Sequence, residues 1–287
     1  MTPERNVIYA SVRLLVFPPS FEYVRASSLE EAVKLLSDRE DAAPLAGGQS
    51  LIPLLKLRAV SYGLLVDIGR LKELRYARFG GEVEVGALAR HFELEESPCG
   101  FLREVASGIA DVQVRSLGTI GGSLAHADPF GDWPAAMLAL GAVVKIVGPN
   151  GLREVGIDGF IKGPYHTALG RGELIHGVSF KCPPRGAYVK FSRRHNDFAI
   201  AAVAVAADLR DGHLAYVRLA AFGASDRPVR LRKAESVLSG ARLTPDVVAE
   251  AVEAARREMD PPPDFRASGE YRRHLVGVAL KRALERL

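Results

Sequence analysis

Two pairs of adjacent glycines constrain this chain more than any other feature of its sequence. Gly47-Gly48, within PLAGGQSLIPLLKLR, lies between an apolar stretch that predicts a strand and a run that predicts a helix. Gly121-Gly122, within TIGGS, also follows an apolar segment. Glycine accepts a positive φ and lets another group approach the backbone without a Cβ in the way. The chain must therefore form two tight turns with accessible backbone.

The first pair has two interpretations. The first N–H groups of a helix lack partners within it and lie at its positive end, so a phosphate can bind there, with the Ser50 hydroxyl as a further donor. Alternatively, the glycines form a turn and Ser50 only caps the helix. The second pair repeats the chemistry between the hydroxyls of Thr119 and Ser123. Together the loops favour two anion sites, or one diphosphate held from both sides. Neither a Rossmann nor a P-loop motif is present.

The segment AHADPFGDWP, which follows the second pair, places Asp128 and Asp132 four residues apart. We expect Asp132 to be the N-cap of a helix that has Pro134 in its first turn. Both carboxylates could accept hydrogen bonds from the sugar or ribityl hydroxyls of a nucleotide-like ligand. No metal site is predicted, because no further Asp, Glu or His joins the pair at close spacing.

Composition argues against several other functions. The two cysteines, Cys99 and Cys182, form no CxxC motif and no Cys/His cluster, so no zinc or iron–sulfur site is predicted and a reducing cytoplasm is expected. The net charge of +4 comes from arginines interleaved with acids, which indicates a solvated surface rather than a nucleic-acid interface. No stretch is long and apolar enough to span a membrane, and the first residues lack the pattern of a signal peptide.

The order of the expected elements predicts an α+β protein. AAPLA, YGLLVDIG and EVEVGAL predict strands, and AVVKIVGPNGLREV predicts a hairpin. After about Gly177, alternating or apolar runs with a turn at Asp211-Gly212 precede predicted helices at Pro228–Leu238, Thr244–Met259 and Tyr271–Leu287. A domain boundary is expected near HGVSFKCPPRG.

These motifs resemble a known family. PLAGGQSLIPLLKLR and TIGGSLAHADPFGDWPAAMLALGA are similar to the two FAD-binding motifs of the medium subunit of molybdenum hydroxylases, such as carbon monoxide dehydrogenase, xanthine dehydrogenase and aldehyde oxidoreductase. FEYVRASSLEEAVKLL is similar to the usual opening of that subunit. RRHNDFAIAAVAVAADL resembles the start of its C-terminal domain, and GEYRRHLVGVALKRALERL resembles its last helix.

The resemblance implies a vanillyl-alcohol-oxidase-type FAD-binding fold of the α+β class. Two α/β subdomains, expected at residues 17–68 and 69–176, would hold non-covalent FAD. A C-terminal α+β domain is expected at 177–287. Residues 1–16 would be an N-terminal extension outside the family pattern.

The resemblance also implies which residues contact FAD. The backbone of the first loop would wrap the pyrophosphate, and the second loop would complete the cradle: Ala46, Gly47, Gly48, Gln49, Ser50 and Leu51, then Thr119, Ile120, Gly121, Gly122 and Ser123. Many relatives have His at position 49 and Asn at position 123. The ribityl or adenosine part would contact His126, Asp128 and Asp132. The flavin would lie near Leu174 or Ile175 and close to Lys190, with Phe198 over the ring. Lys190 could stabilise negative charge on reduced flavin, or it could be a solvated strand lysine.

The resemblance assigns the metal centres to other chains. A large subunit would carry molybdopterin and oxidise the substrate, and a small subunit would carry two [2Fe-2S] clusters. This chain would take the electrons onto FAD and pass them to an external acceptor, in a dimer of heterotrimers. It therefore needs no catalytic acid, base or nucleophile of its own. The alternatives are a stand-alone flavin oxidoreductase of the same fold and a basic nucleic-acid-binding module. The loop RRHND, Arg193 to Asp197, is expected to form part of the docking face for the small subunit.

Overall fold

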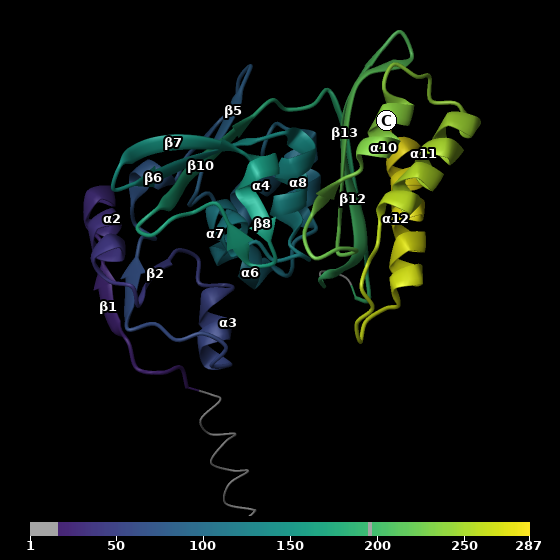
Figure 1. Ribbon diagram of the computed structural model, residues 1–287. Helices are drawn as coiled ribbons and strands as arrows, with labels where there is room; N and C mark the ends of the chain where they lie inside the picture. The colour runs from purple at the N-terminus through teal and green to yellow at the C-terminus, as the bar shows by residue number, and fades with distance from the viewer. Residues whose placement is uncertain (1–16, 195–196) are drawn as a thin grey trace, which may run out of the picture.

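The computed structural model describes residues 17–194 and 197–287, so the predicted extension at residues 1–16 lies outside it. Three parts follow one another along the chain (Figure 1): a small parallel sheet, a larger antiparallel sheet with helices, and a second antiparallel sheet under the C-terminal helices. This mixed architecture confirms the predicted fold class.

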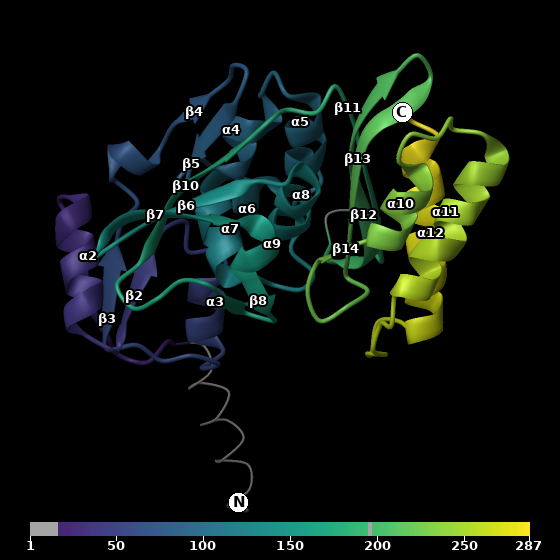
Figure 2. The same ribbon diagram turned by 45° about the horizontal axis from the view of Figure 1, so that its top comes forward.

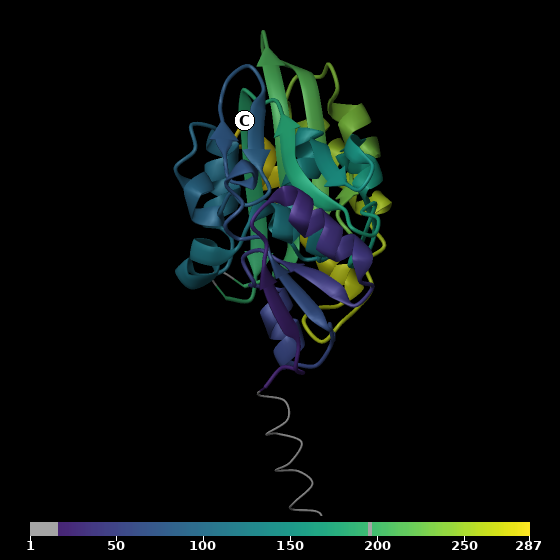
Figure 3. The same ribbon diagram turned by 90° about the vertical axis from the view of Figure 1, so that its left-hand side faces the viewer.

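The first part is a parallel sheet with strand order β1-β3-β2, seen in front of the molecule in Figure 3. Its elements are β1 (Glu22–Arg25), α2 (Leu29–Asp38), β2 (Ala42–Leu45), α3 (Leu51–Lys56) and β3 (Leu64–Asp67). The apolar stretches in β2 and β3 form the strands predicted for them. Since β2 ends just before the first glycine pair and α3 begins just after it, that loop lies at the carboxyl edge of a parallel sheet, where ligands commonly bind.

The second part is an antiparallel sheet with strand order β4-β5-β10-β6-β7. The predicted hairpin at its edge is confirmed as β6 and β7. Helix α8 is buried along its whole length, which makes it the centre of the main hydrophobic core. The elements of this part are η1 (Lys72–Leu74), β4 (Ala77–Arg78), β5 (Val83–Gly86), α4 (His91–Glu95), α5 (Gly100–Ser107), α6 (Val112–Leu117), α7 (Ile120–His126), α8 (Asp132–Leu140), β6 (Val143–Gly148), β7 (Gly151–Gly156), α9 (Ile157–Phe160), β8 (Ile161–Gly163), β9 (His166–Thr167) and β10 (Leu174–Phe180).

The C-terminal part is a sheet with strand order β11-β12-β13-β14, packed between α8 and the last three helices (Figure 2). Both faces are covered, which explains why β12 is apolar from Ala199 to Ala207: Ala202 and Ala204 face α8, whereas Val203 and Val205 face the C-terminal helices. The elements are β11 (Arg185–Ser192), β12 (Ala199–Arg210), β13 (His213–Phe222), β14 (Val229–Arg230), α10 (Arg232–Leu238), α11 (Pro245–Glu258) and α12 (Gly269–Leu284).

The three C-terminal helices are confirmed, with one correction. Thr244 caps α11 by accepting a hydrogen bond from the backbone of Val247, as its position predicts. The helix predicted from Pro228 begins only at Arg232, because Val229 and Arg230 pair with β13 as the short strand β14. The predicted boundary between residues 176 and 177 falls within β10.

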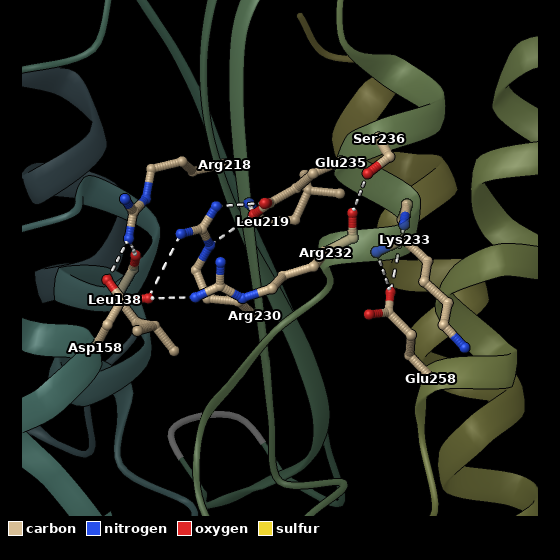
Figure 4. A network of polar contacts seen from close by, with 11 residues as sticks. Leu138, Asp158, Arg218, Leu219, Arg230, Arg232, Lys233, Glu235, Ser236 and Glu258 are labelled. Carbon is tan, nitrogen blue, oxygen red and sulfur yellow. Dashed lines mark hydrogen bonds and ion pairs between the residues drawn. The ribbon is translucent and has the colours of Figure 1, made fainter.

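An ion-pair network joins the second and C-terminal parts (Figure 4). Asp158, in α9, lies 2.8 Å from the Arg218 guanidinium and 3.2 Å from that of Arg232. Arg230 continues the network to Glu235. Burial raises the pKa of Asp158, but the hydrogen bond from Arg218 and the neighbouring guanidinium charges outweigh it, so the net pKa is lowered. The carboxylate is therefore held charged at the junction.

A disulfide links the second part to the connection between the two domains. Cys99 precedes α5 and Cys182 lies between β10 and β11, and their Sγ atoms are bonded. The spacing of the cysteines did not indicate this bond, because 83 residues separate them. Both cysteines of the chain are used, so no free thiol remains. Within residues 17–194 and 197–287, no helix is long and apolar enough to cross a membrane.

Candidate functional site

The first glycine loop leaves its backbone donors open. Among the described residues, the N–H groups of Gly47 through Leu51 donate no hydrogen bond to the protein; the first N–H group after the loop that does is that of Ile52, which bonds to the Gly48 carbonyl. Gly48 has a φ of +71°, which favours glycine. Ser50 precedes α3, but its hydroxyl makes no capping bond. Successive open N–H groups in such a turn form an anion-binding nest.

The second glycine pair does not form the predicted turn, because Gly121 and Gly122 lie in the first turn of α7. In this segment, Thr119 to Ser123, which we continue to call the second glycine loop, the backbone donors from Ile120 onward are used. Ile120 and Gly121 donate to the carbonyls of Ala89 and Ala87, and Ser123 donates to the Thr119 carbonyl. The Thr119 hydroxyl caps α7 by accepting from the Gly122 N–H group, at 3.1 Å. Among the described residues, the Ser123 hydroxyl has no hydrogen-bond partner, so this segment can offer a ligand a side-chain oxygen rather than N–H groups.

The structure brings the two loops into contact. A Cβ on Gly47 would lie 2.1 Å from the carbonyl oxygen of Leu117, directly before the second motif. A Cβ on Gly121 would lie 2.5 Å from the Cβ of Ala87. The sequence-based alternative of two independent anion sites is therefore less favoured than one site between the loops.

A buried histidine, His91, is hydrogen-bonded to the residue that precedes the second loop. The His91 backbone N–H donates to the Gly118 carbonyl, and its Nδ1 accepts from the Trp133 indole at 2.9 Å. This bond assigns the neutral ring proton to Nε2. Burial, with a smaller contribution from the Arg115 charge, lowers the pKa of His91 to about 4. His91 was not among the predicted site residues, and no sequence motif marks it.

His126 and Asp128, expected at the ribityl or adenosine part, lie together at the C-terminal end of α7: His126 is its last residue and Asp128 follows it. The His126 Nε2 atom is 3.8 Å from the Asp128 carboxylate, and its ring centroid is 5.1 Å from that of Tyr165. The Tyr165 hydroxyl is 3.5 Å from the same carboxylate. Burial lowers the pKa of His126, so the imidazole is neutral near pH 7 and can both donate and accept. Tyr165 is a further candidate that the sequence did not identify.

Asp132 and Lys190 face each other at the junction with the C-terminal domain. The Lys190 ammonium lies 2.8 Å from the Asp132 carboxylate and 3.0 Å from the Gly108 carbonyl, and the Tyr188 hydroxyl donates to the same carboxylate. Burial raises the pKa of Asp132, although Lys190 and Tyr188 oppose this. The alternative of a solvated Lys190 is wrong, because its side chain is only 9% exposed.

The predicted N-cap role of Asp132 is also wrong. Gly131 has the extended backbone of an N-cap, with φ −76° and ψ 137°, and Asp132 is the first helical residue. Its carboxylate turns inward to Lys190 rather than back to the helix N–H groups. Pro134 does lie in the first turn, as predicted.

The remaining predicted residues lie in two different environments. Leu174 and Ile175 are buried in separate hydrophobic clusters on β10. Phe198 is 51% exposed at the start of β12, next to Phe130 and Phe265 around the Arg266 guanidinium. Arg193, Arg194 and Asp197 of the expected docking loop are exposed, and residues 195 and 196 lie outside the described chain.

The site thus combines an open nest, free hydroxyls and a neutral histidine beside a carboxylate. This set suits an anionic group joined to a polyhydroxylated sugar or ribityl chain, as in a dinucleotide. FAD fits it, because the N–H groups of the first loop need an acceptor and the positive φ of Gly48 belongs to the turn that leaves them open. No group of His, Cys, Asp and Glu able to hold a metal occurs in residues 17–194 and 197–287.

Comparison with known sequences agrees with this geometry. Residues 19–181 match the FAD binding domain in molybdopterin dehydrogenase, and residues 186–287 match the CO dehydrogenase flavoprotein C-terminal domain. The glyceraldehyde dehydrogenase medium chain of Sulfolobus acidocaldarius is 37% identical over 94% of this chain and 99% of its own. The carbon monoxide dehydrogenase medium chain of Afipia carboxidovorans is also 37% identical, over 94% of this chain and 98% of its own.

Solved structures show the same likeness. The structure of carbon monoxide dehydrogenase from Hydrogenophaga pseudoflava superposes with a TM-score of 0.91 at 38% identity, over 94% of this chain and 98% of that one. Quinoline 2-oxidoreductase from Pseudomonas putida superposes with a TM-score of 0.89 at 33% identity, over 94% and 97% of the two chains. The protein is therefore an FAD-binding oxidoreductase subunit. It belongs to the family of FAD-binding medium subunits of molybdenum hydroxylases, as its motifs predicted.

Proposed function

We propose that this chain carries FAD between two partners: it accepts electrons from [2Fe-2S] clusters on a small subunit and passes them to an external acceptor. A large molybdopterin subunit would oxidise the organic substrate. The relatives named above as medium chains support this division of labour. Both cysteines of this chain are joined to each other, so neither is free to ligate an iron–sulfur cluster.

The observation that carries the proposal is the open nest from Gly47 to Leu51, which lies against the second glycine loop. We expect its N–H groups to bind the FAD pyrophosphate, with Ser123 as a side-chain donor. His126 and Asp128 would contact the ribityl or adenosine part. We keep Leu174, Ile175 and Phe198 as predicted contacts of the flavin end, and expect Lys190 to act there only as an ion pair with Asp132.

The assembly and location are also proposals. We expect a dimer of heterotrimers in the cytoplasm, with Arg193, Arg194 and Asp197 at the interface with the small subunit. A disulfide in that compartment must resist thiol reductants, and Cys99 is 3% exposed, which limits their access. Reversing the charge of both arginines should weaken association with the small subunit and leave FAD content unchanged. Unaltered co-purification and electron transfer would place the interface elsewhere.

The test uses the purified complex. Its visible spectrum should show flavin, and acid precipitation should leave the flavin in the supernatant, because FAD is expected to be non-covalent. After rapid mixing with the organic substrate, the iron–sulfur absorbance should change before the flavin absorbance. A complex without flavin, a flavin that stays with the washed pellet, or a flavin reduced before the clusters would each contradict the corresponding part of the proposal.

A further inference from the structure

Arg266 has an unusual environment in the connection between α11 and α12. Its guanidinium carbon lies 4.4 Å from the ring centroid of Phe130, 5.3 Å from that of Phe265 and 5.8 Å from that of Phe198. These rings come from three segments: the loop before α8, the same connection as Arg266, and the start of β12. Cations stack on aromatic faces through the ring quadrupole, so the three rings fix the guanidinium in place.

The stacked guanidinium has an unused hydrogen-bond donor. The Nη1 atom of Arg266 is buried, and it has no hydrogen-bond partner. No ion pair to Arg266 is found among residues 17–194 and 197–287. A buried charged donor without an acceptor costs free energy, and buried polar groups in native proteins are almost always satisfied. An acceptor supplied by a bound ligand would remove that cost.

The charges of the neighbouring cations already have partners, although the buried Nε atom of Arg272, like Nη1 of Arg266, has no hydrogen-bond partner. Arg272 also stacks on Phe130, but it donates to the carbonyls of Ile200 and Gly223 and forms an ion pair with Asp264 at 2.6 Å. Arg272 is 1% exposed and holds these loops together. Lys190, the cation that the sequence suggested for reduced flavin, is neutralised by Asp132. Of Arg266, Arg272 and Lys190, Arg266 is thus the cation whose charge has no ion-pair partner among the described residues and can serve a ligand.

Arg266 also lies close to the residues around Asp128, because it stacks on Phe130. The chain runs from the second glycine loop through α7 to Asp128, whose carboxylate accepts from the Phe130 backbone N–H at 2.8 Å. Tyr165 contacts Asp128, and burial and that carboxylate raise the pKa of Tyr165, which the Arg266 charge opposes. A ligand that extends from the glycine loops past His126 and Asp128 would meet the ring cluster next.

We propose that Arg266 donates its Nη1–H group to the flavin ring of bound FAD and stabilises the negative charge that the ring acquires on reduction. This inference rests on the proposed function, which places the flavin beside Phe198. Two electrons from the partner's clusters and one proton from water convert the oxidised ring to its reduced monoanion. A fixed positive charge in a partly buried site stabilises that anion more than the neutral oxidised ring. Arg266 therefore makes the flavin a better electron acceptor.

The test is the flavin midpoint potential of the purified complex, measured by spectroelectrochemical titration, together with the dissociation constant for FAD. Arg266→Gln removes the charge and keeps a donor of similar reach, whereas Arg266→Lys keeps the charge. Arg257→Gln, at an exposed arginine of α11, is the matched control. We expect Arg266→Gln to reduce the preference for reduced over oxidised FAD about tenfold, which lowers a two-electron potential by about 30 mV. Arg266→Lys should retain most of the wild-type preference for reduced FAD. The midpoint potential of the control should equal that of the wild type.

The outcomes separate this inference from the proposed function. A wild-type complex without flavin would overturn the proposed function. A flavin-loaded Arg266→Gln complex with the wild-type potential would overturn the role of Arg266 alone. If Gln and Lys lower the potential equally, the positive charge is not the cause, and the inference is also overturned. If Arg266→Gln loses FAD, the Arg266→Lys complex provides the test. A midpoint potential equal to that of the wild type supports the inference. A tenfold or larger loss of its preference for reduced over oxidised FAD contradicts it.

Discussion

In the loop after β2, the backbone N–H groups of Gly47 through Leu51 are open, whereas at the start of α7 those of Ile120 through Ser123 all bond to the protein. Both segments contain two adjacent glycines, but the first pair lies in a loop before a helix and the second pair lies in the first turn of a helix. The difference shows that a shared motif can divide the work of one site. The first loop supplies donors for an anion, and the second supplies a wall with hydroxyl groups.

Within each pair, the two glycines also differ. Gly47 and Gly121 lie against neighbouring backbone or Cβ atoms that leave no space for a side chain. A Cβ on Gly48 would instead meet only the side chains of Ile52, at 3.1 Å, and Leu45. Gly47 and Gly121 therefore serve packing, whereas Gly48 serves the positive φ of its loop. The comparison predicts that equivalent substitutions have different consequences.

The largest effect is expected at a packing glycine. Gly121→Val should force α7 away from Ala87, because three atoms of Ala87 lie within 3 Å of the new Cβ. Overpacking of this kind costs about 1–3 kcal/mol or more. Thermal unfolding followed by circular dichroism should show a clearly lower midpoint. Gly81→Val is the control, since nothing lies within 4 Å of a Cβ there; equal midpoints for the two variants would show that Gly121 is not needed for packing.

The next effect is on binding. Gly48→Val should reduce FAD affinity about a hundredfold, equivalent to about 2.7 kcal/mol, because a β-branched residue strains the positive-φ backbone that forms the anion nest and presses on the Ile52 side chain. Gly240→Val provides a matched control, with a φ of +74° against +71° and open space around its Cβ. Isothermal titration calorimetry with FAD should show the loss of affinity in Gly48→Val and not in Gly240→Val. Similar losses of affinity would mean that general strain, not the nest, is responsible.

A smaller effect is expected from the histidine under the second loop. The pKa of folded His91 is about 4, below the ordinary value of 6.5, so the unfolded chain binds a proton between these values and the folded chain does not. The stability contributed by this difference is therefore lost as pH falls. From pH 7 to pH 5, the free energy of unfolding should fall by about 2 kcal/mol for this reason.

Denaturant unfolding of His91→Gln at both pH values should show a correspondingly weaker pH dependence than that of the wild type. His213→Gln, at an exposed histidine in the β12–β13 hairpin, should retain the wild-type dependence. If His91→Gln also retains the wild-type pH dependence of stability, the buried imidazole does not control the acid stability of this part of the fold.

The smallest effect is expected from the cap of the second loop. Thr119→Val removes the oxygen that accepts from the Gly122 N–H group, which should cost about 1 kcal/mol of stability. FAD affinity should change less than threefold, because this N–H group is not assigned to the ligand. A loss of affinity as large as that of Gly48→Val, measured in the same titration, would show that the two loops bind the anion alike.

Local patterns in the sequence predicted much of this molecule. The apolar and alternating runs, the Thr244 cap and the first glycine loop follow from short-range preferences, and the structure has them in the expected places. The second glycine pair instead lies inside α7. The family motifs predicted the cofactor class. The sequence did not separate the two loops, because the acceptors that Ala87 and Ala89 provide to α7 come from a distant turn. The Cys99–Cys182 bond, Tyr165 and the three-ring setting of Arg266 are likewise products of tertiary contact, which no local pattern encodes.

Hydrogen–deuterium exchange with and without FAD tests the division between the loops most directly. We predict that in the FAD-free protein the peptide containing Gly47 to Leu51 exchanges quickly, and that FAD slows its exchange at least tenfold. The peptide containing Ile120 to Ser123 should already exchange slowly and change little, since its N–H groups have protein acceptors. Strong FAD-dependent protection of the second loop, with no change in the first, would contradict the account.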